Sequence, residues 1–230
     1  MKKPLYFLLP ALFIMLFLPV ENFSQSGTAV TFRIGTLGAE IGVVRSLNSQ
    51  FNVRGGINFL GYTHDGETDP GEGEYALNYE ADLNFFSIAA LVDYMPFENW
   101  FRLSAGLLIN TNDVTGTGMI ADNVVLSERT VYTPEQIGKL ELTIEPSSAV
   151  SPYIGIGYGN PVASDKKLGF FFDLGVIYQG SPDVILKADK NSMIYPTTDP
   201  NVHDNAKVME DAIQDIKWYP VLTFGLSYQF

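Results

Sequence analysis

The C-terminal residues Trp218-Tyr-Pro-Val-Leu-Thr-Phe-Gly-Leu-Ser-Tyr-Gln-Phe230 carry the clearest indication of the fold. From Leu222 to Phe230 a large apolar side chain occupies every second position, and small or polar residues occupy the positions between them. This alternation is typical of a β-strand whose two faces meet different surroundings. A half-buried strand of a soluble protein alternates in the same way, but it rarely ends a chain on five large apolar side chains with an aromatic last residue.

The end of this stretch carries a second indication. Leu226, Tyr228 and Phe230 resemble the terminal signal by which the assembly machinery for outer-membrane barrels recognises its clients. We therefore expect that machinery and the lipid of a bacterial outer membrane to be partners of this chain.

Similar segments of about ten residues recur along the chain, as expected for a membrane barrel in which alternate residues face lipid and lumen. A parity argument adds a first strand, because the terminal strand ends in the periplasm and segment 36–46 must run downward. The expected strands before the terminal one cover residues 28–34, 36–46, 51–59, 80–94, 101–109, 147–159 and 170–179. The sequence predicts an all-β fold, a closed antiparallel transmembrane β-barrel of eight strands, because closure pairs every backbone group within hydrocarbon.

The connections between the expected strands differ in length. Short turns are expected in the periplasm at 47–50, 95–99 and 160–167, and longer outer loops at 64–79, 118–146 and 185–216. The first outer loop carries the acidic residues Asp65, Glu67, Asp69, Glu72 and Glu74. Such charge is typical of a solvated loop, and the alternative is a negative vestibule that concentrates cations. Within the last loop, residues 204–216 are expected to form a short helix.

Composition agrees with surface that faces something other than water. The chain has 230 residues, of which 46% are hydrophobic and only 17% charged, whereas soluble domains carry about 25% charged residues. The absence of cysteine excludes disulfides, thiolate metal sites and a cysteine nucleophile. A formal net charge of −12 disfavours nucleic acid as a partner.

The N-terminus has the pattern of an export signal. Lys2 and Lys3 precede the apolar residues 5–20, and Ser24 and Ser26 supply a small-x-small cleavage pattern. We predict that 1–26 is a cleaved signal peptide and that 27–230 forms the outer-membrane barrel domain. A membrane-anchor helix is the alternative, which the shortness of the apolar run and Pro10 disfavour.

Five ionisable residues are expected on the lumen face of the strands: Glu40, Arg54, Asp93, Arg102 and Asp173. Turn positions predict that Asp93 lies opposite Arg102 and that Glu40 lies diagonal to Arg54. Side chains fill the interior of an eight-stranded barrel, and charges buried there must be paired. This network is therefore either a structural ion-pair plug or a polar path for a charged solute. One spare negative charge would favour a cation.

Catalysis is not expected. The two histidines, His64 and His203, fall in predicted outer loops, and neither belongs to a recognisable catalytic or metal-binding motif. The glycine-rich stretch 155–159 alternates like a barrel wall and not like a nucleotide-binding loop. The sequence therefore predicts no enzyme, no catalytic residue, no metal site and no cofactor.

The second half of the chain resembles a known family. Ser151-Pro-Tyr-Ile-Gly-Ile-Gly-Tyr-Gly-Asn-Pro161, then Gly169-Phe-Phe-Phe-Asp-Leu-Gly-Val-Ile-Tyr-Gln-Gly-Ser-Pro-Asp-Val184, then Trp218-Tyr-Pro-Val221, are similar to CarO-type outer-membrane barrels in that order. The resemblance covers roughly the last 80 residues. It implies an eight-stranded barrel that acts as a slow channel for ornithine and other small basic amino acids.

Two functions follow from these observations. The first is a slow channel or binding barrel for small basic solutes, as the resemblance implies and the acidic loops favour. The alternative is a structural or surface-interaction barrel with a plugged lumen and no transport. The residues alone leave both open.

Overall fold

The computed structural model describes residues 27–68, 76–121, 124–127, 130–134, 138–162, 167–188 and 200–230. The predicted signal peptide, residues 1–26, lies outside the described residues, and so do the loop acids Asp69, Glu72 and Glu74.

Eight strands form a closed antiparallel ring in the order β1-β2-β3-β4-β5-β10-β11-β13. Strand β13 returns to β1, with pairs that run from Ala29 and Gln229 to Gly35 and Thr223. The ring strands are β1 (Thr28–Gly35), β2 (Gly38–Ser46), β3 (Phe51–Glu67), β4 (Leu77–Tyr94), β5 (Phe101–Asn110), β10 (Val150–Tyr158), β11 (Leu168–Tyr178) and β13 (Trp218–Gln229). The prediction of an eight-stranded barrel, including its first strand, is confirmed.

Tight connections join the ring strands at the end where both chain termini of the barrel lie, which we call the periplasmic end. The turn between β2 and β3 is built on Asn48, whose side-chain oxygen accepts the backbone N–H groups of Gln50 at 2.9 Å and Phe51 at 2.8 Å. Asparagine favours this arrangement because its short amide mimics a turn of the backbone. These turns fix the register of the hairpins that follow them.

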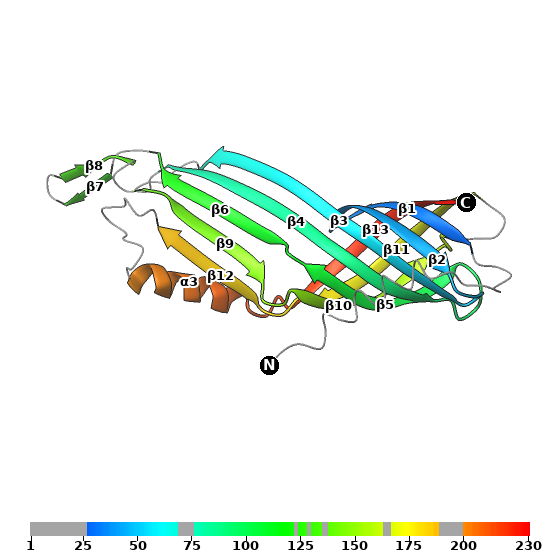
Figure 1. Cartoon of the computed structure of the whole chain (residues 1–230). Coiled ribbons are helices and arrows are strands. Elements are labelled where there is room, and N and C mark those ends of the chain that lie inside the picture. Colours follow the sequence, from blue (N-terminus) through cyan, green and yellow to red (C-terminus); the bar gives the residue numbers. More distant parts are fainter. Residues whose placement is uncertain are drawn as a thin grey trace.

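At the opposite, outer end the long connections are folded. Three further strands continue the sheet from the outer half of β4: β6 (Asp113–Ile120), β9 (Leu140–Pro146) and β12 (Pro182–Ala188). With the outer halves of β3 and β4 they form a five-stranded sheet in the order β12-β9-β6-β4-β3, here called the outer sheet. It rises on one side of the barrel only (Figure 1). The expected outer loops at 118–146 and 185–216 overlap these strands, which the sequence does not predict.

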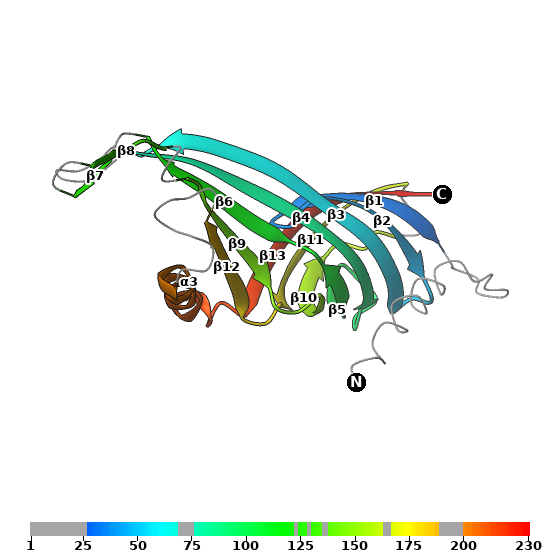
Figure 2. The same ribbon diagram turned by 60° about the vertical axis from the view of Figure 1, so that its left-hand side comes forward.

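Short irregular segments connect strands of the outer sheet to strands of the barrel. Residues 111–112, 147–149 and 179–181 separate β5 from β6, β9 from β10 and β11 from β12. On the other side of the barrel, β1 and β2 do not extend into the outer sheet (Figure 2). Two short strands, β7 (Val124–Ser127) and β8 (Thr130–Tyr132), form a separate hairpin.

The last outer connection contains helix α3 (Pro200–Ile213), close to the predicted helix at 204–216. It contacts β12, at the edge of the outer sheet farthest from β3 (Figure 1). In the described parts of the chain, no helix is long and apolar enough to cross a membrane.

Candidate functional site

The outward face of the barrel carries the apolar side chains of the alternating strands. Residues in the middle of the wall are exposed, for example Ile154 at 63% and Ile41 at 57%. Aromatic pairs flank them: Phe51 stacks on Tyr94 with 4.9 Å between ring centroids near the periplasmic end, and Tyr178 meets Trp218 at 5.0 Å near the outer end. An apolar band between aromatic girdles is the surface that a membrane barrel presents to lipid.

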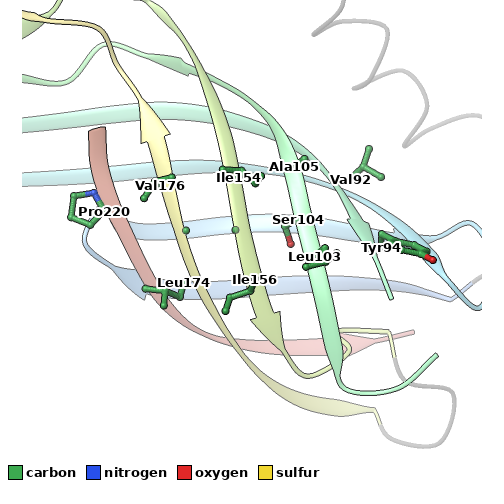
Figure 3. A pocket seen from close by; sticks show the side chains of 12 residues that line it. Val92, Tyr94, Leu103, Ser104, Ala105, Ile154, Ile156, Leu174, Val176 and Pro220 are labelled. Atoms are coloured by element: carbon green, nitrogen blue, oxygen red, sulfur yellow. The ribbon is translucent and has the colours of Figure 1, made fainter. Parts of the chain in front are cut away.

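A shallow groove of about 620 Å³ crosses this outward face over β5, β10 and β11 (Figure 3). The small side chain of Ala105 lies among Leu103, Ile154 and Ile156, and these larger neighbours form its walls. The groove is apolar and part of the lipid-facing band, so we expect acyl chains to fill it.

Inside the barrel, two arginines and two aspartates form a closed ring of ion pairs. Asp173 accepts hydrogen bonds from Arg102 Nη2 at 2.6 Å and from Arg54 Nη1 at 3.1 Å. Asp93 lies 3.3 Å from Arg54 Nε and 3.9 Å from Arg102 Nε, and Ser104 Oγ donates to it at 2.6 Å. All four charged side chains are at most 2% exposed. Each charge therefore has partners of the opposite sign, as burial requires.

A separate ion pair lies beside this ring. Arg33 Nη1 contacts Glu40 Oε1 at 2.8 Å, directly across the hairpin of β1 and β2. The ring of Phe171 lies 5.0 Å from the Arg33 guanidinium and 5.2 Å from that of Arg102. The aromatic face attracts both cations and so links the pair to the ring of ion pairs.

These contacts correct two predicted pairings and one charge balance. Asp93 lies opposite Ser104 and not Arg102, which reaches it only diagonally. Glu40 lies opposite Asn58, and its ion partner is Arg33 instead of Arg54. Both hairpin registers differ from the predicted ones by two residues, because the turns are centred one position later. Arg33 also balances the lumen at three acids and three arginines, which removes the predicted spare negative charge.

Glycine makes room for the ring of ion pairs. A Cβ atom at Gly157 would lie 2.6 Å from Arg102 Nε and 2.8 Å from Asp173 Oδ1. Gly157 therefore lets the guanidinium and carboxylate lie against the wall of β10. In the same glycine-rich stretch, residues 155–158 belong to β10 and form barrel wall as expected, and Gly159 follows the strand.

An apolar layer separates the charged residues from the outer mouth. It consists of buried, inward-facing residues: Leu37, Ala89, Leu91, Leu108, Tyr153, Ile177 and Val221. On β4, Leu91 lies one inward position farther out than Asp93, and on β11 Ile177 lies farther out than Asp173. Between this layer and the charges lies a cavity of about 20 Å³. Such a space holds one water molecule.

The outer sheet reverses the polarity of the two faces. One row of register partners crosses all five strands on the lumen side: Tyr62, Leu83, Val114, Ile144 and Val184. A neighbouring row on the outward side reads Asp65, Glu80, Thr117, Glu141 and Lys187. The outward face is therefore apolar within the barrel and acidic in the outer sheet.

The remaining predicted residues lie in these two regions. Asp65 and Glu67 are exposed on the outward face of β3. His64 faces the opposite side, where its ring lies 6.4 Å from that of Tyr62 and 6.1 Å from that of Tyr79. Leu226, Tyr228 and Phe230 face outward at the end of the chain with 45%, 45% and 80% exposure. Among the described residues, no cluster of histidine, cysteine, aspartate and glutamate could hold a metal ion.

Sequence reasoning missed Arg33, Phe171 and the apolar layer. A signal for Arg33 was present, because Val30, Phe32 and Ile34 alternate with Thr31 and Arg33. This pattern places the arginine on the lumen side of the first strand.

Comparison with known proteins identifies solved structures with a similar fold. No protein-family model and no curated protein matches the sequence. Among solved structures, CarO2 of Acinetobacter baumannii is similar with a TM-score of 0.59 and 18% identity, covering 91% of this chain and all 100% of that one. CarO of Acinetobacter baumannii has a TM-score of 0.53 and 20% identity, covering 89% of this chain and 97% of that one. The chain thus has the fold of a CarO-type outer-membrane β-barrel.

Proposed function

We propose that this protein is an outer-membrane barrel with a closed lumen, which anchors the outer sheet at the cell surface as an interaction module. The observation that carries this proposal is the double obstruction of the lumen. The ring of ion pairs and the apolar layer lie in series in the lumen with their side chains buried, and the cavity between them, about 20 Å³, is too small for an amino acid. The ordered outer sheet offers the surface on which a partner would act.

A second candidate is slow passage of small basic solutes, which the resemblance to CarO-type barrels implies. The acidic outward face of the outer sheet favours it, because Asp65, Glu80 and Glu141 would raise the local concentration of cations. The lumen itself offers no preference, since its acids and arginines balance. Passage would require the apolar layer and the ring of ion pairs to open together.

Uptake into liposomes that contain the refolded protein distinguishes the two functions. Ornithine, arginine and glutamate are added outside, and empty liposomes supply the baseline. A closed barrel predicts baseline uptake of all three, for the parent and for Asp173→Asn alike. Uptake of ornithine and arginine above glutamate would overturn the closed barrel and support the channel.

A further inference from the structure

Among the described residues, the outer half of β3 is an edge of the outer sheet that no other strand covers, here called the uncovered edge. Strand β2 pairs with β3 only as far as Phe59, whereas β4 pairs with β3 to Glu67. Residues 61–67 therefore have a neighbour on one side only among the described strands. Six of these seven residues are exposed, and Gly66 is half-buried. The opposite edge of the same sheet, β12, is in contact with α3.

The backbone groups on this edge can be assigned. Phe51 accepts the N–H of Leu47 at 2.8 Å, so the polar groups of Phe51 face β2. The ladder between β3 and β4 continues without a register shift from Phe51 to Glu67. Because backbone groups alternate along a strand, those of Gly61, Thr63, Asp65 and Glu67 face the uncovered edge. A row of donors and acceptors that no other described strand pairs is a template for another strand.

The side chains on the two faces beside this edge determine which partner strand fits it. On the outward face lie Asp65 and Glu67 of β3, and on β4 Glu80 lies opposite Asp65 and Asp82 opposite Thr63. On the other face lie the rings of Tyr62, which is 55% exposed, and His64. We propose that the edge of β3 binds an extended peptide in which basic residues alternate with apolar ones. The basic residues lie opposite Thr63, Asp65 and Glu67, and the apolar residues lie beside Tyr62 and His64.

Charge argues against a second copy of this chain as the occupant. Two β3 edges joined to each other would set two acidic faces side by side, and like charges on neighbouring strands are destabilising. The same carboxylates that oppose self-pairing favour a basic strand. The inference rests on the proposed role of the outer sheet as an interaction module, and it names the chemistry of the partner.

The test uses the peptide Lys-Val-Lys-Val-Lys-Val-Lys with a fluorescent label, and the refolded full chain in uncharged detergent micelles. The readout is fluorescence anisotropy, together with hydrogen exchange of the backbone amides at residues 61, 63, 65 and 67. We expect binding, protection of these amides and weaker binding at high salt. Thr63→Pro removes one edge donor and leaves the ladder to β4 intact, because the N–H of Thr63 faces away from β4. It should weaken binding about tenfold, whereas Thr63→Ala, which keeps the N–H, should bind like the parent.

N-methylated peptides give the matched control. In an antiparallel pair the lysines oppose the edge residues, so methylation of the lysine nitrogens should abolish binding and methylation of the valine nitrogens should not. Equal binding of both peptides, or of Thr63→Pro and Thr63→Ala, would overturn the proposal, because it would show adsorption to the acidic face only. The absence of binding would also overturn it, as would a protein dimer that Thr63→Pro dissociates. None of these results depends on whether the lumen is closed, which the liposome experiment decides.

Discussion

The barrel and the outer sheet share the long strands β3 and β4, but their apolar side chains face opposite ways. Within the barrel, Ile57 and Phe59 face outward and Arg54 faces inward. In the outer sheet, Asp65 faces outward and Tyr62 faces the lumen side. The ladder between β3 and β4 is therefore continuous across two environments, and the polarity of each face matches the environment that it contacts. The change falls between the pair Phe59–Phe86 and the pair Thr63–Asp82.

The two regions also hold their charged side chains differently. In the barrel, charges are buried, and each one contacts at least one charge of the opposite sign. In the outer sheet, acids such as Glu80 and Asp65 stand side by side at exposed positions, where water screens them. Substitutions should therefore have large effects in the lumen and small effects on the outer sheet.

The largest effect is expected for Arg102→Ala. This change leaves Asp93 and Asp173 buried with one cationic partner fewer, and breaking a buried pair costs about 3–5 kcal/mol. Unfolding in urea, followed by the fluorescence of Trp100 and Trp218, measures the loss. Lys187→Ala removes a positive charge from an exposed site and serves as the control, with a change within about 0.5 kcal/mol. Equal stability of Arg102→Ala and the parent would show that the ring of ion pairs does not support the barrel.

A double-mutant cycle on Arg33 and Glu40 tests whether these two residues form an ion pair. Arg33→Met or Glu40→Met alone leaves an uncompensated buried charge and should cost about 3 kcal/mol. The double variant replaces both charges with apolar side chains and should be more stable than either single variant. Urea unfolding of the three variants measures this difference. If the two single costs simply add in the double variant, the two residues act independently and the pairing is wrong.

Placing a charge on the outward face tests the two regions directly. Ile154→Arg inserts a guanidinium into the lipid-facing band and should destabilise the refolded barrel by about 2–4 kcal/mol. Thr143→Arg makes the same addition on the outward face of β9, and it should change stability by less than about 0.5 kcal/mol. Comparable losses at the two positions would contradict the reversal of polarity.

The smallest effect is expected for a substitution on the lumen-side face of the outer sheet. Val184 is 8% exposed in the apolar row, and Val184→Ala should weaken the pairing of β9 and β12 by about 1–2 kcal/mol. Hydrogen exchange of the β12 amides reports this local loss. Ile185→Ala, on the other face of the same strand and 38% exposed, should have the smaller effect. The reverse order would mean that the apolar core of the outer sheet lies on the opposite face.

Alternation predicted the ring strands because each of them faces lipid on one side, and lipid demands an unbroken apolar row such as Leu222 to Phe230. Register was not predictable in the same way. It depends on turn geometry, such as the Asn48 turn and the positive φ of 51° at Glu98 in the next one. An error of two residues keeps every side chain on its face but changes its partner, which is why Glu40 was matched with Arg54.

The outer strands escaped prediction for a different reason. They are short, and segments such as Asp113–Ile120 alternate polar with small or apolar residues without a continuous apolar row. Their pairing partners lie far along the chain, as for β6 and β9 or β9 and β12. The acidic residues of these segments do not reveal the strands, because charge alone does not distinguish a solvated loop from a solvated face of a strand.

The most direct test of the polarity reversal is a spin-label scan along the outward face of β3. The chain has no cysteine, so Ile57→Cys, Phe59→Cys, Thr63→Cys and Asp65→Cys each give a single labelling site. In lipid bilayers, collisions with oxygen report hydrocarbon, and collisions with a water-soluble nickel chelate report water. We predict that oxygen dominates at 57 and 59 and that the nickel chelate dominates at 63 and 65. Dominance of oxygen at all four positions would contradict the account, because the outer half of β3 would then lie in the membrane.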